Sequence, residues 1–264
     1  MLRGIGVVVG TMLGAHLALG EPLEGRLQAI QAGATLRLAY RTDSRPFSFL
    51  DQAGRPAGYS IELCERVAKS LQRELGLSDL AIRWVQVDTR TRFQAIVDVT
   101  VDMECGSTTV SLSRMKIVDF SSLIFAESTG VLVRSRAGVF GFDDLAGKRI
   151  GVIPDSTNAK AVREQLERRK LTAVLVEFDD REAGVAALRR GEVDGFATDK
   201  LVLLALAQAA NMRDYAVLPD DLSFEPFAIM LPQGDWRFRL AVNTALAREF
   251  RSGAGRRPLH QILQ

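Results

Sequence analysis

The segment KRIGVIPDSTNAKAVREQLERRKLTAVLVEFD, residues 148–179, contains a complete strand, helix and strand in sequence order. Residues 148–154 form a short apolar run that predicts a strand, and residues 173–179 predict a second one. Between them, residues 156–169 predict a helix. This order is typical of parallel strands joined by a crossover helix, so the segment indicates an α/β fold.

The same alternation continues on both sides of this segment. After it, a helical pattern ends at Gly191, and glycine is a residue that commonly terminates helices. Before it, an apolar stripe at helical spacing lies between two further apolar strands. Together these patterns predict a mainly parallel sheet flanked by helices. The further expected elements are strand 35–41, helix 60–75, strand 80–87, helix 181–191, strand 193–198 and helix 199–210.

The repeat of this pattern before and after about residue 128 predicts two α/β lobes. The extended segments 126–135 and 217–231 are natural crossings between them. A chain that crosses twice joins its lobes by a two-strand hinge and leaves a ligand cleft between them. The expected division is a signal peptide 1–20, the first part of lobe 1 at 21–127, lobe 2 at 128–222 and a return segment to lobe 1 at 223–264.

The N-terminus has the composition of a secretory signal peptide. Arg3 precedes an apolar run over residues 5–19, and small residues around Gly20 predict cleavage there. A membrane anchor is the alternative, but the run is shorter than the ~20 apolar residues that a membrane span needs. We therefore expect a soluble, exported protein.

Composition and cysteine content narrow the function classes. The net charge is only +2 and the arginines are scattered, which argues against a nucleic-acid-binding surface. In an exported chain, Cys64 and Cys105 fit either one disulfide or two buried thiols, and their spacing leaves both open. With His16 and His260 they make no recognisable set of metal ligands, so no metal or cofactor is expected.

Sequence motifs typical of enzymes are also absent. After the signal peptide the only histidine is His260, near the C-terminus, so no histidine-based triad is indicated. Neither the P-loop nor the dinucleotide-binding spacing of glycines occurs. The lack of such motifs is weak evidence, and a binding protein and an enzyme both remain open at this point.

A polar segment, ECGSTTVSLSRMKIVDFS at residues 104–121, gathers hydroxyl side chains around a single arginine, Arg114. One interpretation is a turn leading into a helix, with Ser111 as a cap and Arg114 in solvent. The other is an anion site, because a guanidinium presents a fork of donors that matches a carboxylate.

Five ordered motifs follow one another along the chain: RPFSFLDQAGRPAGYSIEL (45–63), ECGSTT (104–109) with Arg114 after it, VDFS (118–121), DLAGKRIGV (144–152) and GEVDGFATD (191–199). Together they resemble the polar amino-acid family of periplasmic solute-binding proteins of ABC transporters, and the likeness covers about residues 35–250. Within that family, CGSTT and the nearby arginines are most similar to the glutamate/aspartate-binding members. The resemblance implies the two-lobed type II fold of periplasmic binding proteins.

The resemblance also implies how a ligand α-carboxylate would be held. Arg114 would bind it, assisted by hydroxyl and amide donors at Ser107 and Thr109. From the second lobe, Ser156 and Thr157 would present a helix N-terminus to the same carboxylate. A plain N-cap is the alternative role for these two residues.

The remaining family positions concern the ammonium and the ligand side chain. Asp199 matches the acid that pairs with the α-ammonium, although it would also suit a helix cap. Arg41 and Arg92 match contacts to the side-chain carboxylate, with Thr89 beside them. Arg181 falls where the group tends to carry a histidine and would add positive charge. Guanidiniums gathered in one pocket with little water need an anionic ligand or acidic neighbours. The alternative is that these arginines lie at the surface, as most arginines in proteins do.

The function implied is the capture of glutamate or aspartate in the periplasm by clamshell closure and delivery to a membrane permease, by a monomer that catalyses no reaction. Two alternatives remain: a periplasmic dehydratase similar to cyclohexadienyl dehydratase on the same scaffold, and a ligand-sensing module. Residues 252–264 depart from the aromatic ending common in the family.

Overall fold

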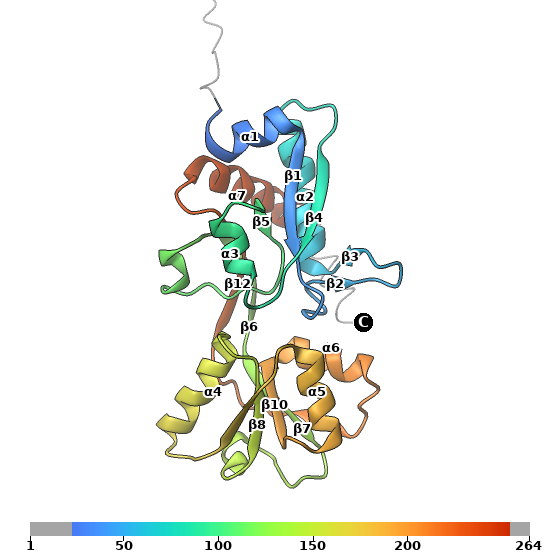
Figure 1. The fold of residues 1–264 in the computed structure, drawn as a ribbon, viewed down its shortest axis with the longest axis vertical. Helices are drawn as coiled ribbons and strands as arrows, with labels where there is room; N and C mark the ends of the chain where they lie inside the picture. The colour runs from blue at the N-terminus through green and yellow to red at the C-terminus, as the bar shows by residue number, and fades with distance from the viewer. Residues whose placement is uncertain (1–22, 254–264) are drawn as a thin grey trace, which may run out of the picture.

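The computed structural model describes residues 23–253 and shows two lobes, one above the other (Figure 1). The predicted signal peptide and residues 254–264 lie outside the described residues. Within residues 23–253, no helix has the length and apolar character needed to cross a bilayer.

The helices predicted from the sequence are present with bounds close to the expected ones. Gly191 ends one of them in the left-handed conformation, with φ of 76°, as its position at the end of the pattern indicated. Along residues 23–253 the α-helices are α1 Gly25–Gly33, α2 Tyr59–Glu74, α3 Arg92–Val97, α4 Thr157–Arg168, α5 Arg181–Arg190, α6 Lys200–Ala209 and α7 Trp236–Arg251, and the 3-10 helices are Arg114–Lys116 and Phe142–Leu145.

The strands form one five-stranded sheet in each lobe and a small β2–β3 hairpin. Lobe 1 has the order β4-β1-β5-β12-β6, and lobe 2 has the order β11-β7-β10-β8-β9. The strands are β1 Thr35–Tyr40, β2 Phe49–Leu50, β3 Pro56–Ala57, β4 Ala81–Gln86, β5 Met103–Glu104, β6 Asp119–Glu127, β7 Thr129–Arg134, β8 Arg149–Val152, β9 Val174–Glu177, β10 Gly195–Asp199, β11 Tyr215–Val217 and β12 Glu225–Leu231.

Both sheets are mixed, which corrects the prediction of mainly parallel sheets. In lobe 1, β4, β1 and β5 pair in parallel, whereas β12 is antiparallel to both of its neighbours. In lobe 2, β9, β8 and β10 pair in parallel, whereas β7 is antiparallel to both of its neighbours. The reversed strands, β12 and β7, are those that enter their lobe from the other one.

The two lobes are joined by two adjacent crossings. β6 ends at Glu127 and β7 begins at Thr129, while β12 returns from Glu225, which pairs with Glu127. Because β7 runs away from the crossing, β10 runs toward it and ends there at Asp199. The carboxyl ends of the parallel strands therefore face the space between the lobes, where ligands bind in open α/β sheets. The residue bounds of the lobes stay a prediction.

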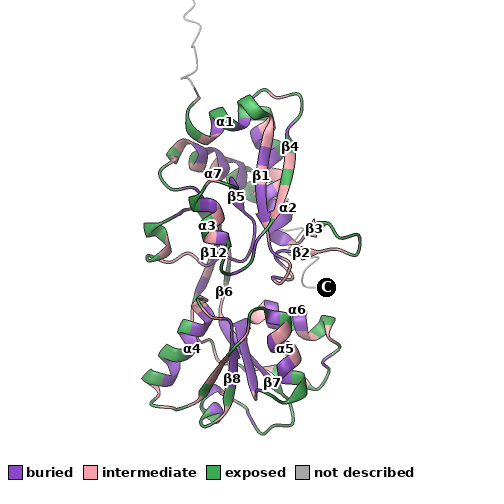
Figure 2. Cartoon of the chain, viewed as in Figure 1, coloured by how far each residue is buried: buried purple, intermediate pink, exposed green. Residues whose placement is uncertain are grey.

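Burial is concentrated on the sheets of both lobes, with exposed residues on the outer helix faces (Figure 2). At the centre of lobe 1, Phe47 packs edge-on against Phe125 and Phe227, with ring centroids 5.1 Å apart in each pair. A disulfide joins Cys64 of α2 to Cys105 after β5, and both residues are fully buried. The disulfide interpretation of the two cysteines is thereby confirmed.

Candidate functional site

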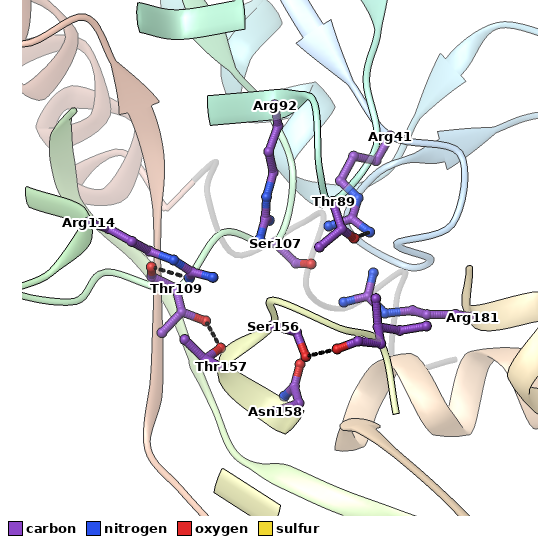
Figure 3. A pocket seen from close by; sticks show the side chains of 11 residues that line it. Arg41, Thr89, Arg92, Ser107, Thr109, Arg114, Ser156, Thr157, Asn158 and Arg181 are labelled. Atoms are coloured by element: carbon purple, nitrogen blue, oxygen red, sulfur yellow. Dashed lines mark hydrogen bonds between the residues drawn. The ribbon is translucent and has the colours of Figure 1, made fainter. Parts of the chain in front are cut away.

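A narrow cavity lies between the lobes at the carboxyl ends of the strands. Side chains enter it from lobe 1 above and from lobe 2 below (Figure 3). The structure brings every ligand-binding residue expected from the sequence to this cavity except Asp199, which lies behind the wall. The lining residues are Arg41, Thr89, Arg92, Ser107, Thr109, Arg114, Ile153, Ser156, Thr157, Asn158 and Arg181.

The lobe 1 side of the cavity includes the loop after β5, which buried groups hold in place. Glu104 ends β5 and is fully buried, and its Oε2 accepts a hydrogen bond of 2.7 Å from Thr108 Oγ1. Gly106 lies against that carboxylate, and a Cβ at this position would overlap it. Ser60 at the start of α2 donates to the Gly106 carbonyl at 2.7 Å, and the disulfide at Cys105 ties the same loop to α2. These contacts fix the loop that presents the following hydroxyl groups.

Arg41 is buried but has an acid partner. Its guanidinium donates to both carboxylate oxygens of Asp43 at 2.8 and 2.7 Å, and to Thr89 Oγ1 at 2.8 Å. Burial lowers the pKa of Arg41, but Asp43 raises it, and the result lies above the ordinary value. For Asp43, burial acts against ionisation, yet Arg41 and Arg181 bring its pKa well below the usual range. Asp43 therefore neutralises Arg41 within the folded protein.

Arg181 reaches from lobe 2 to lobe 1. At the start of α5 it donates to Asp199 Oδ2 at 3.3 Å and to Thr198 Oγ1 at 3.0 Å, both in lobe 2. Across the cleft, it donates to Ser44 Oγ at 2.8 Å and to the Asp43 carbonyl at 3.3 Å. Burial and the nearby Arg41 lower the pKa of Arg181. This side chain is thus a direct connection between the lobes.

Asp199 lies behind the cavity wall with both oxygens occupied. Besides the contact from Arg181, Oδ1 accepts a hydrogen bond of 2.9 Å from Asn158 Nδ2. Burial raises the pKa of Asp199, although Arg181 and Asn158 favour the charged form. Asp199 stands at the N-cap position of α6, but its side chain makes no capping hydrogen bond. Its contacts are with the cleft rather than with its own helix.

Arg92 and Arg114 differ from the other two arginines, since neither makes an ion pair within residues 23–253. Arg92 donates to Thr108 Oγ1 at 2.7 Å, and its buried Nε has no partner. Arg114 donates to the Thr109 carbonyl at 2.8 Å. Both guanidiniums lie over the ring of Phe93, each 5.1 Å from its centroid.

Burial lowers the pKa of both of these arginines, although buried acids nearby act in the opposite direction. For Arg92, burial comes first and repulsion by Arg41 and Arg114 second, and together they lower the pKa well below its ordinary value. Burial also lowers the pKa of Arg114. An anion in the cavity would relieve both effects. Arg114 therefore lines the cavity, which corrects the interpretation that placed it in solvent, although its amide does donate to Ser111 Oγ at 3.3 Å.

The lobe 2 wall is the N-terminus of α4. Ser156 accepts from the Ala159 amide at 3.0 Å and donates to the Ile153 carbonyl at 2.7 Å, so its hydroxyl has the capping role that was the alternative expectation. The first amides of the helix, at Thr157 and Asn158, have no acceptor within the helix. An anion in the cavity would meet donors and a partial positive charge here.

Glu225 is a polar residue of the cleft that sequence reasoning missed. It is buried at the start of β12, and its Oε2 accepts from Thr109 Oγ1 of lobe 1 at 2.6 Å and from Thr157 Oγ1 of lobe 2 at 2.7 Å. Its Oε1 accepts from Ser223 Oγ at 2.6 Å and from Thr129 Oγ1 at 3.3 Å. The carboxylate is held by hydroxyl groups alone, and it links the lobes at the hinge.

Residues 36–257 match the family model of bacterial extracellular solute-binding proteins, family 3. The chain belongs to this family. The resemblance expected from the sequence motifs is therefore confirmed.

Known proteins similar to this solute-binding protein agree on the fold. The L-glutamate/L-aspartate-binding protein of Pseudomonas aeruginosa is 32% identical over 93% of this chain and 82% of the relative. The glutamate/aspartate import solute-binding protein of Salmonella typhimurium is 26% identical over 94% of this chain and 83% of the relative. Among solved structures, an ancestral amino-acid-binding protein described as a precursor of cyclohexadienyl dehydratase matches with a TM-score of 0.79, at 24% identity, over 91% of this chain and 100% of the other. The match to this solved structure confirms the two-lobed α/β architecture.

Some residues of the cleft of this solute-binding protein were not predicted, because sequence patterns give little indication of them. Asn158 and Ile153 line the cavity next to residues that motifs did identify. Asp43 pairs with Arg41, two residues before it, and Glu225 contacts Thr109, which is far from it in sequence. A glutamate opening an otherwise apolar strand was the one available sign of Glu225.

Proposed function

We propose that this protein captures a dicarboxylic amino acid, glutamate or aspartate, in the periplasm and presents it to the permease of an ABC importer. The observation that carries the proposal is the pair of cleft guanidiniums without an acid partner, Arg92 and Arg114. Two separate cations in a cavity lined by hydroxyls suit a ligand with two carboxylates. The relative at 32% identity is named for the same two amino acids.

In this proposal the α-carboxylate binds Arg114, Ser107 and Thr109 from lobe 1. The opening amides of α4, at Thr157 and Asn158, approach it from lobe 2.

The side-chain carboxylate binds Arg92, with Arg41 and Thr89 beside it. Asp199 would accept the α-ammonium, for which it must be released from Arg181.

Binding and closure are coupled because the donors lie on both lobes. Only the closed form lets one ligand contact Arg114 and the start of α4 together, so the ligand favours closure by its differential affinity. A dissociation constant near 1 μM corresponds to about −8 kcal/mol. Several charge-assisted hydrogen bonds of about 1.5–3 kcal/mol each are sufficient for this after ordering costs. No chemical step is required of a monomer acting in this way.

Isothermal titration calorimetry of the purified mature protein tests the proposal. We expect glutamate or aspartate to bind with micromolar or tighter affinity. Lysine and leucine should show no heat of binding, because the described lining residues include no carboxylate for lysine and offer leucine little apolar surface beyond Ile153. Tight binding of lysine or leucine, with none of glutamate or aspartate, would overturn the ligand assignment and leave the family assignment intact.

A dehydratase is the second candidate, because one solved structure of the same fold is described as a precursor of cyclohexadienyl dehydratase. In addition, burial raises the pKa of Asp199, and a general acid needs a raised pKa to stay protonated. Against it, Asp199 does not line the cavity. Incubation with prephenate or arogenate separates the two, since an enzyme would release carbon dioxide and an aromatic product. We expect no turnover.

A further inference from the structure

The cavity surface is cationic and carries no carboxylate of its own. Among the described residues, its lining includes four arginines but neither aspartate nor glutamate. The acids nearest to it lie behind the wall, and hydroxyl, amide or guanidinium groups already contact each of them. These acids are Asp43, Glu104, Asp199 and Glu225.

Arg181 occupies the position on Asp199 that a ligand ammonium would need. Asp199 is 2% exposed, and its oxygens accept from Asn158 at 2.9 Å and from Arg181 at 3.3 Å. The guanidinium is fixed by further acceptors, Thr198 Oγ1 at 3.0 Å and Ser44 Oγ at 2.8 Å. An incoming ammonium would have to displace a buried, hydrogen-bonded cation, which would then lose its acid partner.

The charges around the cavity also favour a dicarboxylate without an amino group. Arg41 is neutralised by Asp43 and Arg181 by Asp199, which leaves Arg92 and Arg114 without an acid partner in the described part of the chain. Glu104 and Glu225 behind the wall offset the charge of these two guanidiniums only in part, since the pKa of both stays lowered, and an aliphatic dicarboxylate would bring two negative charges directly to them. The corresponding amino acid brings an additional positive charge into a space already lined by four guanidiniums, where like charges repel.

We propose that Arg181 is a specificity-determining residue that replaces the ligand ammonium on Asp199. The cavity then accepts dicarboxylates without an amino group at least as tightly as the amino acids of the same length. This inference rests on the proposed function for its carboxylate contacts, at Arg92 and Arg114, and differs from it in making the amino group dispensable.

Calorimetry with two matched ligand pairs tests it on the wild-type protein. Glutarate is compared with glutamate and succinate with aspartate, so that each pair differs only in the amino group. We expect the deamino member of the tighter pair to bind with equal or higher affinity. If the amino acid binds and its deamino counterpart is more than tenfold weaker, the inference is overturned while the proposed function stands.

Two other outcomes separate the proposals further. If glutarate or succinate binds and neither amino acid does, the inference is supported and the amino-acid part of the proposed function fails. If none of the four ligands binds, both fail, because the two-carboxylate site itself is then wrong.

The variant Arg181→Gln identifies the residue responsible. It frees Asp199 for an ammonium, so we expect the preference to shift toward the amino acid by at least tenfold relative to wild type. Arg189→Gln, an exposed arginine of the same helix, is the matched control and should leave the preference unchanged. A folded Arg181→Gln protein with the wild-type preference would overturn the role of Arg181. If that variant does not fold, the wild-type ligand pairs still decide the ligand class.

Discussion

At the scale of single residues, the cleft separates arginines that are neutralised from arginines that are not. Arg41 and Arg181 each contact a carboxylate, whereas Arg92 and Arg114 share only hydroxyl, carbonyl and aromatic neighbours. A buried guanidinium without a counterion is costly, and Arg92 Nε has no hydrogen-bond partner within residues 23–253. An anion bound in the cavity would therefore give these two guanidiniums the counterion that they lack.

Replacing Arg114 by alanine tests its proposed contact with the α-carboxylate. We expect the affinity for the ligand to fall at least tenfold, or about 1.4 kcal/mol, because a charge-assisted fork is lost. The affinity of Arg114→Lys should lie between those of the wild type and Arg114→Ala, because lysine keeps the positive charge but cannot form the paired hydrogen bonds of a guanidinium. Arg55→Ala, at an exposed arginine of the β2–β3 hairpin, is the calorimetric control. A loss below tenfold in Arg114→Ala would show that the carboxylate binds elsewhere.

The Asp43 carboxylate predicts a pH dependence of stability. Its pKa is lowered in the folded protein, so its contribution is complete above the unfolded value of about 4 and is lost as the pH falls toward the folded value. The variant Asp43→Asn should therefore have a lower Tm than wild type from pH 5 to 8, and the difference should shrink below about pH 4.

Thermal unfolding monitored by circular dichroism across that range measures this difference. Glu164→Gln, at an exposed carboxylate of α4, is the control and should change Tm little. A Tm difference that grows on acidification would contradict the pairing of Asp43 with Arg41.

How much of the site the sequence could predict depends on the kind of residue. Arg114 and Ser107 lie in a recognisable motif, and Arg41 follows a strand end that must face the cleft. Glu225 is different, because its importance comes from partners distant in sequence, such as Thr157. Periodicity cannot show such pairs. The contact between Arg181 and Asp199 likewise required the three-dimensional arrangement.

At the scale of elements, the disulfide between α2 and the loop after β5 supports the lobe 1 wall. It closes a sequence separation of 41 residues, and a crosslink of this kind contributes about 2–4 kcal/mol to stability. The double variant Cys64→Ala/Cys105→Ala should lower Tm by roughly 5–15 °C. Reductant should lower the Tm of the wild type and leave that of the variant unchanged. A wild-type Tm insensitive to complete reduction would contradict this contribution.

The long elements could be predicted, and the short ones could not. α2 and α4 carry apolar stripes long enough for their period to be read. β5, by contrast, has only two residues, and a pattern cannot be recognised over that length. The reversed direction of β12 and β7 escaped prediction because strand direction follows from the path between lobes and not from composition.

At the scale of the whole molecule, closure depends on groups that contact both lobes at once. Glu225 accepts from Thr109 of lobe 1 and Thr157 of lobe 2, so Glu225→Gln replaces an acceptor by an amide donor at this junction. We expect a larger radius of gyration without ligand, and an affinity reduced about three- to tenfold, on the order of 1 kcal/mol.

Small-angle X-ray scattering with and without saturating ligand measures this shift. Saturating ligand should restore the wild-type radius of gyration, and Glu192→Gln, at an exposed carboxylate of lobe 2, should behave as wild type throughout. An unchanged radius of gyration in unliganded Glu225→Gln would show that Glu225 does not influence closure.

The paired crossings also limit the mechanics of the molecule. β6 and β12 are hydrogen-bonded side by side up to Glu127 and Glu225, and on the other side the Leu222 amide donates to the Thr129 carbonyl at 3.0 Å. Two antiparallel segments that are hydrogen-bonded together on both sides of the crossing can bend as one hinge, whereas sliding or twisting of one against the other would break these hydrogen bonds. We therefore expect one hinge-bending motion between the lobes, along which the arginines of each lobe move together as a unit.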